Sequence, residues 1–151
     1  MYFKNIDDKL LVEASRIMYD ADEVDVQIPE YQEVTEHAVR RFIQRATRGS
    51  VKDQDRLLCN AQIGKILNSA YKRDNYMGKT YDAKYGTTYW YRGCTDDGKV
   101  KYLIPQNTNG CIKTIFNWGF NNDKVKFLKS RIIQLTEKLT EAYTNDGSKN
   151  A

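Results

Sequence analysis

The chain has 151 residues, of which 40% are hydrophobic and 29% are charged, and its formal net charge at pH 7 is +4. This length fits one domain, and this composition is typical of a globular protein, which excludes an intrinsically disordered chain. The sequence has no apolar run near the roughly 20 residues of a membrane-spanning helix and no signal-peptide pattern at its start, so we expect a cytoplasmic protein without a membrane partner.

The first half of the chain is predicted to be mainly helical. Apolar residues recur at helical spacing over residues 6–19 and predict an amphipathic helix. Residues 24–28 then alternate between apolar and polar side chains before a proline, which predicts a short edge strand. Thr35 is a good N-cap for a helix over residues 35–48, and another helix is predicted over residues 50–71.

The next part of the chain is predicted to form a sheet. Residues 72–86 are polar and rich in tyrosine, and we interpret them as a loop. The hydrophobic period then changes to two, and three strands joined by short turns are predicted over residues 87–93, 100–105 and 111–118. Consecutive strands with short turns form an antiparallel meander.

A C-terminal amphipathic helix is predicted over residues 123–144, and residues 145–151 are predicted to be a disordered tail. The narrow apolar stripe of this helix could dock on the sheet or on another subunit, as in a homo-oligomer. The stripe consists of Val125, Leu128, Ile132, Leu135 and Leu139. The order of elements predicts a single α+β domain over residues 1–144, with N-terminal helices packed on a small antiparallel sheet. Residues 1–33 are its acidic start and residues 34–116 its core module.

Charge is unevenly distributed along the chain. Residues 1–36 carry three basic and ten acidic side chains, whereas residues 37–86 carry eleven basic and four acidic side chains. A basic middle region favours an anionic partner such as RNA or a nucleotide. The acidic start could shield this region within the chain or across an oligomer.

The only histidine begins a row of cationic side chains on the helix predicted over residues 35–48. His37, Arg41 and Arg45 are spaced by four residues and form one stripe, and Arg48 lies on the same side. Arginine suits bidentate phosphate binding, and a neighbouring histidine could transfer a proton. The alternative is an ordinary solvated helix face. Such faces usually mix charges at a spacing of four, and this stripe holds no acidic residue, which favours an anion-binding role.

Two further groups of side chains are candidates for contacts with a ligand. Tyrosines between residues 71 and 102 are interleaved with lysines and arginines, and they could stack on bases or pack in a half-buried sheet. Because alternate residues of a strand share a face, at most Tyr89 and Tyr91 could join the site, with Arg92 pointing the other way. On the last predicted strand, Lys113 lies opposite Thr114, whose hydroxyl could orient a phosphate or a 2′-oxygen.

Neither a metal nor a cofactor is predicted. Cys59, Cys94 and Cys111 have no metal-ligand spacing, and we expect free thiols because cytosolic cysteines stay reduced. With a single histidine and no Cys-x-x-Cys pair, a zinc site is not expected. The GxxxxGK[ST], GxGxxG, HExxH and GxSxG motifs are absent.

The segments TEHAVRRFIQR, YWYRG…VKYLIP and IKTIF, with a helix between the first two, resemble a pattern of small ribonucleases, the barnase–EndoU–colicin–RelE group. This group includes toxins and phage-encoded modules, and the resemblance covers about residues 34–116. It implies metal-independent RNA cleavage in which the ribose 2′-hydroxyl attacks the adjacent phosphate and gives a 2′,3′-cyclic product. It implies three catalytic residues, His37, Arg41 and Thr114. Arg45 and Tyr89 would be auxiliary contacts.

The resemblance is incomplete, so two other functions stay open. The acidic start and the C-terminal helix lie outside the pattern, and IKTIF has no acidic or histidine neighbour. The leading prediction is a RelE-like endoribonuclease in the cytoplasm, the host cytoplasm if the protein is phage-encoded. The main alternative is a non-catalytic phage-type inhibitor that binds a nucleotide or nucleic acid, or blocks a nucleic-acid enzyme, through the same arginine face. A third is an assembly protein that oligomerises through its C-terminal helix.

Overall fold

The computed structural model describes residues 7–24, 27–29, 33–40, 73–94, 101–120 and 122–149. Its labelled elements are, in chain order, α1 (Asp8–Glu23), β1 (Glu33–Val34), the 3-10 helix η1 (Arg73–Asn75), β2 (Tyr76–Asp82), β3 (Gly86–Cys94), β4 (Lys101–Gln106), β5 (Cys111–Ile112), β6 (Phe116–Asn117) and α4 (Asp123–Lys149). A further helical segment covers residues 36–40. The predicted α+β class is confirmed.

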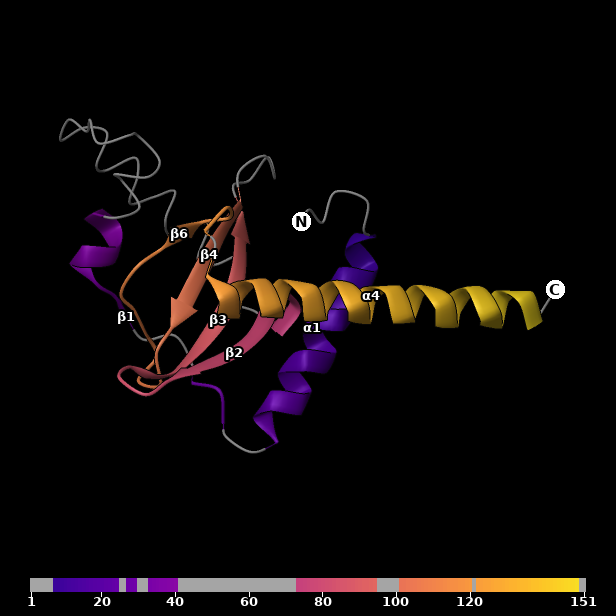
Figure 1. Ribbon diagram of the computed structural model, residues 1–151, viewed down its shortest axis with the longest axis horizontal. Coiled ribbons are helices and arrows are strands. Elements are labelled where there is room, and N and C mark those ends of the chain that lie inside the picture. The colour runs from indigo at the N-terminus through magenta and orange to yellow at the C-terminus, as the bar shows by residue number, and fades with distance from the viewer. Residues whose placement is uncertain are drawn as a thin grey trace.

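A four-stranded antiparallel sheet with the order β2-β3-β4-β6 forms the central layer. The long helix α4 crosses this sheet and α1 and continues beyond both (Figure 1). β1 and β5 form a separate parallel pair. Figure 1 shows β1 on the side of the sheet away from the C-terminal end of α4. The rest of the helix predicted over residues 35–48, after residue 40, and the helix predicted over residues 50–71 lie outside the described residues.

The first helix forms as its apolar periodicity predicts, but it is longer. Asp7 caps it by accepting a hydrogen bond from the Lys9 backbone N–H at 2.9 Å, and its buried side includes Ala14 and Met18. The helix ends at Glu23, and Val24 keeps helical backbone angles with 82% of its surface exposed. The strand predicted over residues 24–28 therefore does not form where it was expected to start.

The helix extends because its last turn is held by residues that are distant in the sequence. Asp20 pairs with Arg73 at 2.5 Å, and Asp22 accepts a hydrogen bond from the Tyr76 hydroxyl at 2.7 Å. Ile28, predicted to lie in the strand, is buried in a segment without regular structure. Long-range contacts have therefore overridden the local alternation.

The strand β2 corrects the prediction of a loop over residues 72–86. Its first three residues are buried, its next two are half-buried and only its last two are exposed. A register shift between Tyr76 and Gly78 interrupts the pairing with β3, and Gly78 has a φ of +127°. This irregularity places two successive residues, Tyr76 and Met77, in the core. The strand therefore lacks the period of two by which strands are predicted.

The predicted third strand of the meander, residues 111–118, is divided in two. β5 pairs with β1 in parallel, whereas β6 pairs with β4 in antiparallel fashion. Ile112 and Ile115 are both fully buried, although residues three apart in one continuous strand would face opposite sides. The chain therefore leaves the strand geometry over residues 113–115 and lets both isoleucines reach the core.

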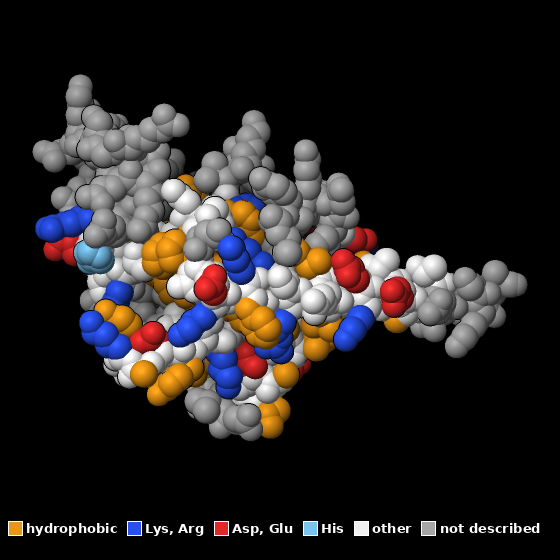
Figure 2. All heavy atoms as spheres, in the orientation of Figure 1, with side chains coloured by type: hydrophobic (Ala, Val, Ile, Leu, Met, Phe, Trp, Pro, Cys, Tyr) orange, Lys and Arg blue, Asp and Glu red, His pale blue; other side chains and the backbone are white. Residues whose placement is uncertain are grey.

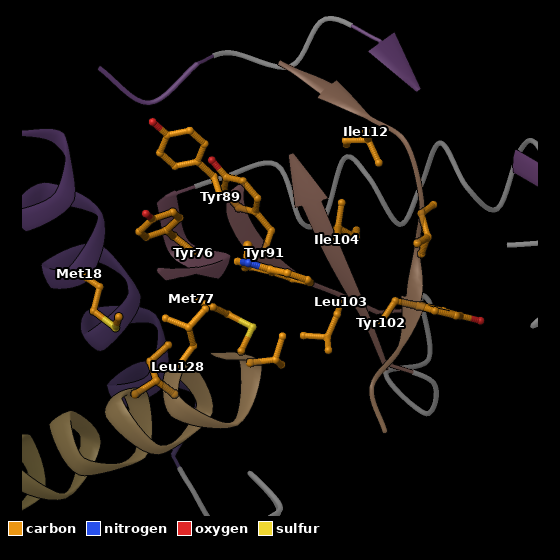
Figure 3. Packing of buried hydrophobic residues seen from close by; sticks show 14 of the residues in the cluster. Met18, Tyr76, Met77, Tyr89, Tyr91, Tyr102, Leu103, Ile104, Ile112 and Leu128 are labelled. Carbon is orange, nitrogen blue, oxygen red and sulfur yellow. The ribbon is translucent and has the colours of Figure 1, made fainter. Parts of the chain in front are cut away.

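The core occupies both faces of the central sheet. The pairing of β3 with β4 places Tyr91 and Ile104 on one face and Trp90 and Leu103 on neighbouring positions that face the other, and all four are buried. Figure 3 shows Tyr76, Tyr89 and Tyr91 grouped together and Met77 turned toward Leu128 of α4. Both faces are thus sealed by packing.

The apolar stripe of α4 packs inside the chain, as one of the two predicted alternatives proposed. The first three stripe residues, Val125, Leu128 and Ile132, are buried, and Leu135 and Leu139 are partly buried against the same core. The helix continues to Lys149, beyond the predicted end at residue 144. Residues 145–149 are therefore helical and not the start of the predicted tail.

Two buried tyrosines indicate that the fold loses stability in alkali. Burial raises the pKa of the Tyr76 phenol, with a further increase from its hydrogen bond to Asp22, and burial also raises the pKa of Tyr91. An unfolded tyrosine ionises at about pH 10, whereas the buried phenols stay neutral to a higher pH. The stability of the fold is therefore fully present below about pH 10 and is lost as the pH rises toward the folded-state pKa. Each phenol then lowers the free energy of unfolding by about 1.4 kcal/mol per pH unit.

We expect Tyr91→Phe to lose less stability than the wild type as the pH rises from about 9 to about 11. Its free energy of unfolding should fall less steeply with pH, because one phenol fewer ionises on unfolding. Urea unfolding followed by tryptophan fluorescence measures both slopes. Equal slopes for the two proteins would contradict the burial of the Tyr91 hydroxyl.

Candidate functional site

Parallel pairing of β1 with β5 brings two predicted site segments to one edge. Val34 pairs with Ile112, and the Thr35 backbone N–H donates to the Ile112 carbonyl at 3.0 Å. The residues that follow two parallel strands leave at the same end, so the start of the helix at residue 36 adjoins residues 113–114. We call the side chains of His37, Lys113 and Thr114 the β1/β5 edge.

The helix at this edge starts as predicted. The Thr35 Oγ1 accepts a hydrogen bond from the Ala38 backbone N–H at 3.2 Å, which is the geometry of an N-cap. Ala38 is fully buried and Val39 packs against the core, whereas His37 is exposed. The apolar arc therefore faces inward and the histidine faces outward, as the helical spacing predicts.

An ion pair lies beside the histidine. The Arg40 Nη2 is 3.0 Å from the Glu36 Oε1, and both side chains are exposed. Exposed pairs of this kind add little stability. Arg41, predicted to be catalytic, and Arg45 and Arg48, predicted to bind phosphate, lie outside the described residues.

Lys113 and Thr114 lie in the connection between β5 and β6. Lys113 is exposed and Thr114 is half-buried. They were predicted on opposite faces of a strand, but this part of the chain has no strand geometry. The buried neighbours Ile112 and Ile115 fix the connection at both ends. The edge therefore carries an exposed imidazole, an ammonium group and a hydroxyl on backbone anchored to the core.

Tyr89 and Tyr91 do not belong to this edge. Only 2% of Tyr89 and 3% of Tyr91 is exposed, and the Tyr91 ring packs edge-on against Tyr76 with a centroid distance of 5.5 Å. They share a face, as predicted, but that face is internal. A buried ring offers no surface to a base, so the prediction that these two tyrosines contact a ligand is wrong, and the packing alternative is correct.

Arg92 was predicted to point away from the face of Tyr89 and Tyr91, and its side chain is also directed into the protein. Its Nη2 donates to the Asp74 carbonyl at 2.8 Å, and burial lowers the pKa of the guanidinium to about 10. The group is therefore still charged at neutral pH. Asp74 also binds Arg16 of α1, with 2.7 Å between Oδ1 and Nε. Arg92 thus joins β3 to η1 and α1 and has a structural role.

The exposed aromatic rings include two members of the predicted tyrosine group and a phenylalanine that was not predicted to contact a ligand. Tyr81 and Tyr85 at the β2–β3 hairpin and Phe127 on α4 are exposed. The available signal was their polar surroundings, because Asp82 and Lys84 flank the two tyrosines and Lys124 and Lys126 precede the phenylalanine.

The described part of the chain gives no indication of a metal centre. It contains no group of three or more His, Cys, Asp or Glu side chains arranged to hold a metal ion. Within the same residues, Cys94 and Cys111 are free thiols, and no helix is both long and apolar enough to cross a bilayer.

Comparisons with protein-family models, with curated proteins and with solved structures found no match to this chain. The side chains at the β1/β5 edge are therefore the basis on which a function can be inferred.

Proposed function

We propose that this chain is a metal-independent endoribonuclease of the RelE-like type that holds the RNA backbone at the β1/β5 edge. The pairing of β1 with β5 is the observation that supports it, because this pairing brings the start of the helix that carries His37 next to the connection that carries Lys113 and Thr114. A cation and a hydroxyl beside an exposed imidazole suit an anionic phosphodiester.

In the proposed reaction, the ribose 2′-oxygen attacks the adjacent phosphorus and the bond from phosphorus to the 5′-oxygen breaks. A proton leaves the 2′-hydroxyl, and a proton is gained by the departing 5′-oxygen. His37 transfers one of these protons, and water exchanges the other. Lys113 and the Thr114 hydroxyl stabilise the negative charge that develops on the non-bridging oxygens. Arg41 follows His37 by one helical turn in the sequence and would add to this stabilisation.

A non-catalytic protein that binds RNA or nucleotides is the second candidate. One observation favours it: the chain has a single histidine, so no second imidazole is available to complete an acid–base pair. Such a protein would use the same cations to bind phosphate and would leave the RNA intact.

Incubation of the purified chain with end-labelled RNA in EDTA distinguishes the two candidates. The ribonuclease should produce fragments that end in a 2′,3′-cyclic phosphate, identified by mass spectrometry. RNA with methylated 2′-oxygens should stay intact, because its nucleophile is blocked. Salt-sensitive binding without fragments would support the second candidate. Absence of both binding and cleavage would contradict both.

A further inference from the structure

A second group of exposed side chains lies where the β2–β3 hairpin meets the start of α4. Three large hydrophobic side chains there are mostly exposed: Tyr81 by 69%, Tyr85 by 74% and Phe127 by 62%. Figure 2 shows cationic side chains alternating with hydrophobic ones over the first half of α4. We call the following set the hairpin platform: Tyr81, Lys84, Tyr85, Lys124, Phe127 and Arg131.

The two parts of the platform are tied together by Lys124. Its Nζ donates a hydrogen bond to the Tyr81 carbonyl and lies 3.7 Å from the Asp82 Oδ2. Phe127 and Arg131 follow Lys124 by three and seven residues, so the three share one side of α4. The hairpin and this side of the helix therefore form a continuous surface.

The hairpin turn is itself ordered by Asp82. Its Oδ1 accepts hydrogen bonds from the backbone N–H groups of Lys84 at 2.7 Å and Tyr85 at 3.1 Å. These bonds lower the pKa of the Asp82 carboxyl and keep it ionised. The turn therefore holds the backbone of Tyr85 in a defined place, which reduces the backbone entropy lost when a ligand stacks on its ring.

Two of the rings have a cation beside them. The Lys84 Nζ lies 5.1 Å from the centroid of the Tyr85 ring, and the Arg131 Cζ lies 5.9 Å from that of Phe127. Apolar patches that bind proteins are depleted of charge at their centre. Single-stranded nucleic acids instead require aromatic rings for the bases and cations for the phosphates. The composition of the platform matches this second requirement.

We propose that the hairpin platform binds a single RNA strand, with bases stacked on Tyr85 and Phe127 and phosphates near Lys84 and Arg131. This inference rests on the proposed function in taking RNA as the ligand, and it adds a second contact surface outside the β1/β5 edge. Bases in a duplex are stacked on one another and cannot cover the rings, so the platform should select single strands.

The test measures fluorescence anisotropy with a labelled single strand in which every 2′-oxygen is methylated, so the RNA stays intact with the wild-type chain. Tyr85→Ala and Phe127→Ala should each weaken binding by about fivefold or more. Tyr85→Phe and Phe127→Tyr should bind like the wild type, because they keep the ring. Phe127→Leu should weaken binding, because it keeps an apolar side chain without a π face.

Matched controls come from the far half of α4. Tyr143→Ala removes another exposed ring and Lys138→Ala another exposed cation, and neither should change the affinity. The charge variant Arg131→Ala should weaken binding and reduce its salt dependence, unlike Lys138→Ala.

The inference would be overturned if Phe127→Leu bound RNA as tightly as the wild type, which would point to an apolar protein contact. Equal affinity for the matching duplex, or no binding by the wild-type chain, would overturn it too. Its outcome is separable from that of the proposed catalysis. Weaker binding by the alanine variants with no cleavage in EDTA would support the platform and refute the ribonuclease, whereas normal binding by those variants with active cleavage would refute the platform alone.

Discussion

Replacing Gly78 with alanine is expected to lower the free energy of unfolding by about 2 to 5 kcal/mol. The residue has a φ of +127°, a backbone angle that residues with a Cβ rarely adopt. A Cβ at this position would lie 2.7 Å from the Leu128 Cδ2 and 3.1 Å from the Met18 Cε. Backbone strain and overpacking therefore act together at the point where α1 and α4 meet over β2.

Two other glycines separate these causes. Gly86 has a φ of +77° with no atom within 4 Å of its added Cβ, so Gly86→Ala should cost only the backbone strain, about 1 kcal/mol. Gly119 also has open space and no positive φ, so Gly119→Ala should be nearly neutral. Urea unfolding of the three variants measures the order. If Gly78→Ala is no more destabilising than Gly86→Ala, the close packing of the two helices over β2 is incorrect.

The close contact at Gly78 also predicts coupling. Leu128→Ala alone should destabilise the protein by about 2 to 5 kcal/mol, because Leu128 is buried and its loss leaves a cavity. In the double variant with Gly78→Ala, part of that cavity is filled by the new methyl group. The combined loss should therefore be smaller than the sum of the two separate losses.

α1, α4 and the β3–β4 hairpin were predictable because their signals are local. The stripe of α4 repeats at helical spacing from Val125 to Leu139, and β3 and β4 alternate as paired strands should. β2 was not predictable, because the irregularity at Gly78 removes its alternation. β1 and β5 contain two residues each, too few for a period, and their pairing joins distant segments.

The candidate site was also predictable only where its signals are local. The spacing of Ala38 and Val39 against His37 fixes which side of the helix faces water, and the structure agrees. The spacing of Tyr89 and Tyr91 shows only that they share a face. Whether that face is covered depends on residues such as Tyr76, which lies in the strand that the sequence did not reveal. Helical direction is a local property, whereas burial of a sheet face is not.

For the proposed ribonuclease, His37→Ala is expected to slow RNA cleavage by about 100-fold or more, because it removes the group that transfers a proton. The fold should be retained, since Ala38 and not His37 faces the core at this turn. Arg40→Ala is the matched control, as it removes an exposed side chain from the same turn and should have a much smaller effect. Cleavage is followed by the release of cyclic-phosphate ends in EDTA.

Two further measurements separate proton transfer from binding. Imidazole added to the solution should partly restore cleavage by His37→Ala. The affinity for 2′-methylated RNA should change by no more than about threefold, because proton transfer acts in the transition state and not in binding. Thr114→Ser should cleave at nearly the wild-type rate, whereas Thr114→Val should be slower by about tenfold or more, because only serine keeps the hydroxyl. Wild-type cleavage by His37→Ala would end the ribonuclease proposal. If cleavage and affinity fell together and imidazole had no effect, His37 would be a binding residue, and the second candidate function would gain support.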